Sequence, residues 1–168
     1  MANELLDVSR LETGKLPIAA EPHDLVVLVS EVTADIGVLD RDRAIVVLAK
    51  AAVPVACDGR LVRRVVHNLM SNAIKHTPAG GAIDVAVTLA NGRARVAVSD
   101  QGPGIPDDAL DRIFEKFGAV TSLREGKYHS SGLGLAFCKL AVEAHGGAIG
   151  VEPRKPRGST FWFDLAQR

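Results

Sequence analysis

Two asparagines and a lysine recur at helical spacing in a segment that reads as a long helix. Asn68 and Asn72 lie one turn apart beside an apolar stripe, and Lys75 or His76 continues their row. Asparagine is a poor residue for a helix interior because its amide competes for backbone hydrogen bonds. Its carbonyl oxygen suits Mg²⁺, and a lysine ammonium suits phosphates that share the ion. The row therefore favours a cation and phosphate site, with a solvated helix edge as the alternative.

A carboxylate ends what reads as a core-facing strand. Small and apolar side chains alternate with other residues along 93–99, and Asp100 continues the apolar face. A buried carboxylate is costly unless it is hydrogen-bonded. Gly102 and Gly104 follow at once in Gly-Pro-Gly-Ile-Pro. Either the register breaks at Asp100, or its carboxylate has a partner that this chain does not supply.

Weaker signals lie between these residues and the C-terminus. Gly132 and Gly134 stand where a loop becomes a helix, so their backbone N–H groups could hold an anion; an ordinary helix-start turn is the alternative. The polar segment 118–131 suits a mobile lid, or a plain surface loop. Phe114 and Phe117 end a short predicted helix and read first as core residues.

Composition indicates one soluble globular domain. The chain has 168 residues, of which 47% are hydrophobic and 24% charged, and its formal net charge is zero. Bulk charge therefore gives no reason to expect nucleic acid or a membrane surface as a partner. Cys57 and Cys138 have no metal-ligand spacing and are expected to be free and buried in a cytoplasmic protein.

The elements that must position these residues form an α+β pattern. Helical periodicity and caps predict main helices over 23–42, 59–77 and 132–147, with short helices over 4–16 and 106–117. Asn91-Gly92 is a strong two-residue hairpin turn. The predicted strands are 44–50, 54–58, 82–90, 93–99, 148–153 and 159–165. About three helices covering one face of a mostly antiparallel sheet is the simplest arrangement.

Five segments resemble, in order, the motifs of one family. HNLMSNAIKHTP, DQGPGIP, RIFEKF, GLGLAFCKLAVEAHGG and GSTFWF are similar to the asparagine, first glycine, phenylalanine, second glycine and last glycine/threonine elements of sensor histidine kinases. The resemblance covers roughly residues 22–166 and is to the catalytic ATP-binding domain. That domain belongs to a superfamily shared with DNA gyrase, MutL and a heat-shock chaperone. The resemblance implies a two-layer Bergerat-type ATP-binding fold.

The resemblance offers a partner for the carboxylate. It implies that Asp100 accepts a hydrogen bond from the adenine amino group, while Thr160 supplies a hydroxyl nearby. Gly102 and Gly104 would let the backbone pass close to the base, and Ile105 would form an apolar wall. The missing partner would then be the nucleotide.

The resemblance also assigns the phosphate end. Asn68 and Asn72 match asparagines near Mg²⁺, with Asn72 the surer ligand, and Lys75 matches a phosphate-contacting lysine. Asn72 and Lys75 would be the catalytic residues. His76 stands where the family commonly has tyrosine, and Phe117 lies in the phenylalanine element. The lid's end at the phosphates would be formed by Gly132, Leu133 and Gly134.

The implied function is transfer of the γ-phosphoryl group of Mg-ATP to a histidine, leaving ADP. That histidine would lie on a helical hairpin domain, of which residues 1–16 resemble only the tail; residues 17–168 would be the catalytic domain. We expect the tail to be frayed or to make a non-native dimer contact. A homodimer would form only through the missing hairpin, and a response regulator receiver domain would act downstream. The alternatives are a nucleotide-sensing module without transfer and an anti-sigma-type serine kinase.

Overall fold

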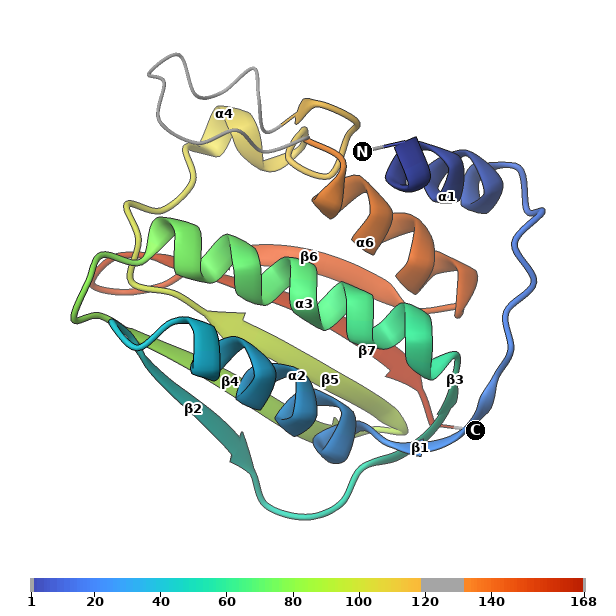
Figure 1. The fold of residues 1–168 in the computed structure, drawn as a ribbon, viewed down its shortest axis with the longest axis horizontal. Coiled ribbons are helices and arrows are strands. Elements are labelled where there is room, and N and C mark those ends of the chain that lie inside the picture. Colours follow the sequence, from blue (N-terminus) through green and yellow to red (C-terminus); the bar gives the residue numbers. More distant parts are fainter. Residues whose placement is uncertain (1, 119–131, 168) are drawn as a thin grey trace.

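Five strands form one sheet in the order β2-β4-β5-β7-β6, which is one layer of the molecule (Figure 1). The computed structural model describes residues 2–118 and 132–167. β2 pairs with β4 in parallel, and the other three pairs are antiparallel. The strands are β2 (Ala44–Ala49), β4 (Ala82–Ala90), β5 (Arg93–Ser99), β6 (Ala148–Pro153) and β7 (Ser159–Ala166). The predicted mixed, mostly antiparallel sheet is confirmed.

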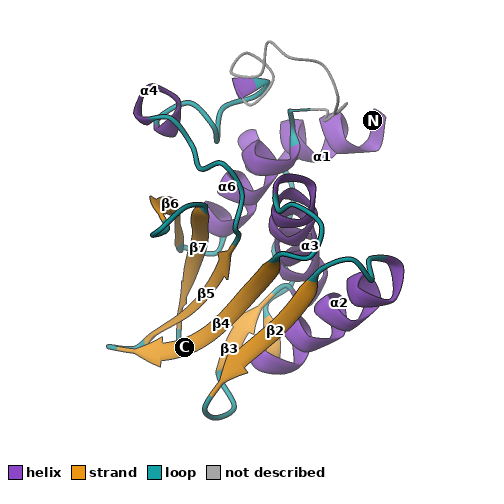
Figure 2. Cartoon of the chain, turned by 90° about the vertical axis from the view of Figure 1, so that its left-hand side faces the viewer, coloured by secondary structure: helices purple, strands orange, loops and turns teal. Residues whose placement is uncertain are grey.

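Three helices lie on one side of this sheet and form the second layer (Figure 2). They are α2 (Leu25–Leu39), α3 (Gly59–His76) and α6 (Gly134–Ala144). Val85, Val96 and Phe163 of the sheet and Leu69 of α3 are fully buried in the core between the layers. The predicted two-layer α+β architecture is therefore confirmed, and its open sheet face has no helix of the described residues over it in Figure 2.

The long helix α3 begins where the sequence predicts a cap. The Asp58 side chain accepts hydrogen bonds from the N–H groups of Arg60 and Leu61, which satisfies donors that the first helical turn leaves unpaired. The apolar residues of α3 recur every three or four positions and are buried against the sheet and α6. The helix ends at His76, and Thr77 caps it in an extended conformation.

The β4–β5 hairpin carries the strand register to the end of β5. Asn91 and Gly92 have φ angles of 53° and 71°, as a two-residue type I′ turn requires. Ala94, Val96 and Val98 are buried, and Asp100 follows them with only 3% of its surface exposed. The register does not break, so the carboxylate lies on the covered side of the sheet.

Two elements differ from the prediction. β1 (Glu21–Asp24) pairs antiparallel with β3 (Pro54–Cys57) in a small second sheet, and no strand was predicted at β1. Its four residues include proline and do not alternate in polarity. The helix predicted over 106–117 contains only α4 (Asp107–Leu110), and turns follow it.

The N-terminal helix α1 (Ala2–Glu12) packs on the domain, contrary to the expectation of a frayed segment. α1 lies against α6, and Val8 is 1% exposed. Ion pairs join the middle and the C-terminal end of α1 to the domain, from Asp7 to Arg64 at 2.5 Å and from Glu12 to Lys116 at 2.7 Å. Leu5 and Leu6 remain half exposed. Burial of one apolar face, together with the two ion pairs, accounts for the packing of α1 on the domain.

Both cysteines are buried and free, as predicted. Burial, with a smaller contribution from the Asp58 charge, raises the pKa of the Cys57 thiol to about 11, so this thiol is protonated at neutral pH. No helix of the described residues has the length and apolar character needed to cross a membrane.

The core makes a direct stability prediction. Leu69 has no exposed surface, so Leu69→Ala is expected to lower the free energy of unfolding by about 2–5 kcal/mol. The matched control Leu39→Ala removes the same atoms from a side chain that is 87% exposed, and should change it by less than about 0.5 kcal/mol. Urea unfolding followed by circular dichroism measures both. Equal losses in the two variants would contradict this description of the core.

Candidate functional site

A cavity of about 620 Å³ lies beside the C-terminal half of α3, at the end of β5. Its walls come from α3, the segment after β5, the start of α6 and the turn between β6 and β7. The lining residues include Asn72, His76, Asp100, Gly104, Ile105, Ile113, Leu135, Arg154, Ser159 and Phe161. The cavity therefore joins an apolar slot to a few convergent polar groups, which is typical of a small-molecule site.

The buried Asp100 carboxylate is held by backbone amides. Its Oδ1 accepts hydrogen bonds from the N–H of Gly102 at 2.8 Å and the N–H of Ser159 at 3.2 Å. These bonds offset part of the cost of burying the charge. Among residues 2–118 and 132–167, hydrogen bonds reach only Oδ1 of this carboxylate, and Asp100 lines the cavity. An acceptor oxygen is thus available to a donor group in the cavity.

Gly102 is a position where a side chain has no room. A Cβ there would lie 2.9 Å from Asp100 Oδ1 and 3.0 Å from the His76 carbonyl oxygen. Gly104 has a φ of 85°, which non-glycine residues rarely adopt. The two glycines therefore let the chain turn tightly beside the carboxylate, and the close approach to a base predicted for them stays a prediction.

The predicted α3 residues divide between the cavity and its surroundings. Asn72 and His76 line the cavity, whereas Asn68 Nδ2 donates to the Gly134 carbonyl oxygen at 3.2 Å, at the first residue of α6. Lys75 lies between Asn72 and His76 in the sequence. Its side chain is half-buried, and it does not line the cavity. The structure thus places Asn68 against the second glycine segment and Asn72 in the cavity.

The remaining predicted residues lie around the start of α6. The N–H of Phe117 donates to the Gly132 carbonyl oxygen at 3.0 Å, which joins the phenylalanine and second glycine segments. Phe117 has a φ of 62° and is 51% exposed, so it is not the core residue that its sequence context first suggested. Leu133 is buried, and Gly132 has a φ of 65°. The predicted lid, apart from Gly118, lies outside the described residues.

Thr160 is not where its predicted role requires it to be. Its hydroxyl lies 2.8 Å from that of Ser99, and it does not line the cavity. Successive side chains of a strand point to opposite faces, so Thr160 and Ser99 share the open face while Asp100 lies on the other. Ser159 is the residue of this segment that lines the cavity and touches Asp100. Strand alternation from Phe161 would have predicted this.

A comparison with known families decides what kind of domain this is. Residues 57–168 match the family described as histidine kinase-, DNA gyrase B-, and HSP90-like ATPase. The chain belongs to this ATPase family. The match includes α3, the cavity and the whole five-stranded sheet except β2.

Two named relatives of the chain are histidine kinases. Sensor histidine kinase AruS of Pseudomonas aeruginosa is 44% identical over 63% of this chain, and hybrid signal transduction histidine kinase D of Dictyostelium discoideum is 33% identical over 98%. The chain spans 11% of the length of each. The crystal structure of full-length ShkA in complex with AMPPNP superposes with a TM-score of 0.85 at 30% identity, over 99% of this chain and 35% of that one. These similarities confirm the predicted fold.

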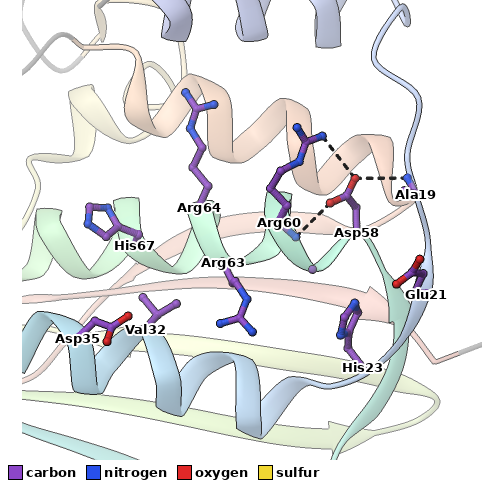
Figure 3. A pocket seen from close by; sticks show the side chains of 11 residues that line it. Ala19, Glu21, His23, Val32, Asp35, Asp58, Arg60, Arg63, Arg64 and His67 are labelled. Atoms are coloured by element: carbon purple, nitrogen blue, oxygen red, sulfur yellow. Dashed lines mark hydrogen bonds and ion pairs between the residues drawn. The ribbon is translucent and has the colours of Figure 1, made fainter.

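A second cavity of about 830 Å³ lies on the other side of α3 of this ATPase-family domain (Figure 3). Its arginines are each paired with a carboxylate: Arg60 with Asp58, Arg63 with Glu31 and Arg64 with Asp7. It lacks Asp100 and both asparagines. The smaller cavity, which brings Asp100 and Asn72 together, is therefore the candidate nucleotide site.

Burial, and then local charge, sets the protonation of His76. Burial lowers the pKa of His76, the Lys75 charge lowers it further, and the Asp100 charge opposes both. Burial also lowers the pKa of Lys75. At neutral pH the imidazole is therefore neutral, and it can accept or donate a hydrogen bond in the cavity without adding a charge.

We predict that His76 titrates below the ordinary histidine value of about 6.5. Lys75→Met removes a nearby positive charge and should raise the pKa of His76. In the wild-type protein, His76 binds a proton more readily in the unfolded state than in the folded state. The free energy of unfolding therefore falls as pH drops from about 6.5 towards the folded pKa of His76. NMR titration of the imidazole C–H signals in nucleotide-free protein measures this; a wild-type pKa above 6.5 would contradict it.

We predict that Gly102→Ala weakens adenine nucleotide binding. Overpacking of about 1–3 kcal/mol at Asp100 and His76 corresponds to roughly a fivefold or greater loss of affinity. Gly37→Ala is the control, because a Cβ at this α2 position meets nothing within 4 Å. It should leave binding unchanged and raise stability by up to about 1 kcal/mol. Calorimetric titration with ADP and thermal unfolding measure both; unaltered affinity in Gly102→Ala would show that the glycine is not needed beside the carboxylate.

Proposed function

We propose that this chain is the catalytic domain of a sensor histidine kinase and binds Mg-ATP in the cavity beside α3. The observation that carries the proposal is the Asp100 carboxylate, which is 3% exposed, holds its Oδ1 on backbone amides and lines the cavity. A buried acceptor beside an apolar slot fits the amino group of adenine. The named relative ShkA has been crystallised with AMPPNP, which supports the same ligand class here.

The adenine end has suitable walls. Ile105, Ile113 and Phe161 line the cavity with apolar surface, and Gly104 leaves its backbone open to a flat ring. Ser159 holds Asp100 through its N–H and also lines the cavity. A base stacked in this slot would direct its amino group to Asp100 and its phosphates toward α6. Thr160 keeps only an indirect role, through Ser99 on the other face of the sheet.

The phosphate end would use α3 and the start of α6. Asn72 would give its carbonyl oxygen to Mg²⁺, with Asn68 close by, and Lys75 would face the phosphates. The described residues contain no group of three or more His, Cys, Asp or Glu side chains able to hold a metal. An ion held by one or two amides plus phosphate oxygens and water fits this donor set. Bound Mg²⁺ would neutralise charge on the phosphates during transfer.

The proposed reaction moves the γ-phosphoryl group to a histidine on a separate hairpin domain. An imidazole nitrogen bonds to the γ-phosphorus as the bond to the β–γ bridging oxygen breaks; ADP leaves, and the imidazole proton passes to a base beside the acceptor. This chain's residues contribute positioning and charge neutralisation, with Gly132, Leu133 and Gly134 at the phosphates. A response regulator would receive the phosphoryl group next, in the cytoplasm.

We predict that Asp100→Asn strongly weakens ADP and AMPPNP binding. The asparagine oxygen can still accept from Gly102 and Ser159, but its NH₂ group then meets the adenine amino group donor to donor. The loss should be at least about tenfold, since an unpaired buried polar group costs about 1–3 kcal/mol. Asp108→Asn, at an exposed acid of α4, is the control and should bind normally. Calorimetry with and without Mg²⁺ measures the affinities. Equal binding by both variants would show that adenine does not contact Asp100.

We predict phosphate transfer only when a hairpin acceptor is supplied. Incubation with Mg-ATP and a histidine-kinase hairpin protein should yield acid-labile, base-stable phosphate on the acceptor, and Asn72→Ala should reduce the yield. The acid-stable phosphate of a serine kinase would favour the anti-sigma-type alternative. Binding of ATP without transfer to any supplied acceptor would favour the sensing module.

A further inference from the structure

One arginine joins three segments of the chain at the edge of the cavity. Arg154, in the turn between β6 and β7, donates from Nη2 to Asp84 Oδ2 of β4 at 2.6 Å. Its Nη1 donates to the Asp100 backbone carbonyl oxygen at 3.3 Å. Asp84 does not line the cavity, whereas Arg154 and Asp100 do. The guanidinium thus connects a carboxylate outside the cavity to the backbone of the carboxylate inside it.

The β6–β7 turn determines where Asp100 lies. The N–H of Asp100 donates to the Ser159 carbonyl oxygen at 2.9 Å, and the N–H of Ser159 donates back to Asp100 Oδ1. A Cβ on Gly158 would come within 2.1 Å of the Asp100 carbonyl oxygen, so the turn's backbone presses directly on that peptide. The N–H of Arg154 closes the turn on the Gly158 carbonyl oxygen at 3.0 Å. Any shift of the turn would therefore move the carboxylate.

The ion pair crosses the sheet to fasten this turn. β5 lies between β4 and β7, and the register aligns Asp84 with Ser99 and Ser99 with Thr160. Arg154 reaches across the end of β5 to Asp84 on β4. The ion pair therefore connects the β6–β7 turn to β4, the strand on the opposite side of β5 from β7. The two side chains are 26% and 32% exposed, so solvent reduces what the pair contributes to overall stability. Its effect is on geometry more than on folding.

We propose that Arg154, held by Asp84, is a positioning residue that sets the direction of the Asp100 carboxylate and so the selectivity of the site for adenine over guanine. This inference rests on the proposed nucleotide function. Guanine presents a carbonyl oxygen where adenine has its amino group, so a correctly placed carboxylate attracts one base and repels the other. A carboxylate released from its position discriminates less.

The test compares ADP and GDP binding in Arg154→Met and in a matched control. Arg154→Met should weaken ADP binding by roughly three- to tenfold, with little change for GDP, so the ADP-to-GDP affinity ratio falls. Arg93→Met removes a similar ion pair with a strand aspartate, Asp164, at 2.5 Å and away from the cavity. It should leave the ratio unchanged. An unchanged ADP-to-GDP affinity ratio in Arg154→Met would overturn the proposal, whether both affinities fell equally or neither changed.

Asp84→Asn tests whether Arg154 depends on its carboxylate. Asp84→Asn should lower the ADP-to-GDP ratio in the same direction, and the double variant should lose no more than Arg154→Met alone. Additive losses would overturn the coupling. NMR signals of the Gly102 and Ser159 amides in nucleotide-free protein supply an independent readout: both should shift in Arg154→Met and not in Arg93→Met. If wild-type protein bound no nucleotide, the proposed function would fail. The amide shifts would still show whether Arg154 positions Asp100.

Discussion

The hydrogen bonds from backbone amides to the Asp100 carboxylate are the constraint on which the site depends. A carboxylate at the end of a buried strand is unfavourable unless donors surround it, and here the donors come from Gly102 and Ser159. These contacts require two close backbone approaches. Gly102 has no room for a side chain, and Gly158 lies against the Asp100 carbonyl group. The sequence around the carboxylate is therefore set by the need to bury one charge while keeping an oxygen available.

Helix α3 serves both the core and the site. Its apolar stripe packs between the sheet and α6, while the adjacent row carries Asn68, Asn72 and His76. Because the core fixes the rotation of the helix, it also fixes the direction of that row. Asn68 connects this row to Gly134 at the start of α6, so packing and polar contacts agree on one placement. The site is thus supported by a helix whose apolar face is buried in the core.

Strong local patterns made most of the fold predictable from the sequence. Strand alternation, the Asn91-Gly92 turn and the Asp58 cap predicted β4, β5 and α3 close to their observed bounds. β1 could not be predicted because its pairing with β3 depends on residues far away in the chain. The docking of α1 likewise depends on Arg64 and α6.

Within the site, the prediction failed where a resemblance was read without the strand geometry. Asp100, Asn72, His76, Gly104 and Ile105 do line one cavity. Thr160 was placed there by its motif, yet the period of two puts it on the other face and puts Ser159 in the cavity. Arg154 carried no signal in its own segment, because its partners lie on β4 and at the end of β5. Contacts between distant segments are what a single sequence hides.

The position of β5 at the centre of the sheet has a thermodynamic consequence. Strands β4 and β7 flank it on both sides, and Asp100 lies at its end, so the proposed ligand contact could not open without disturbing the middle of the sheet. A nucleotide bound there, as proposed, would be linked to global folding rather than to the opening of a peripheral loop. Each tenfold excess over the dissociation constant would add about 1.4 kcal/mol to the unfolding free energy. Occupancy of the site would then be visible as a rise in the melting temperature of the whole domain.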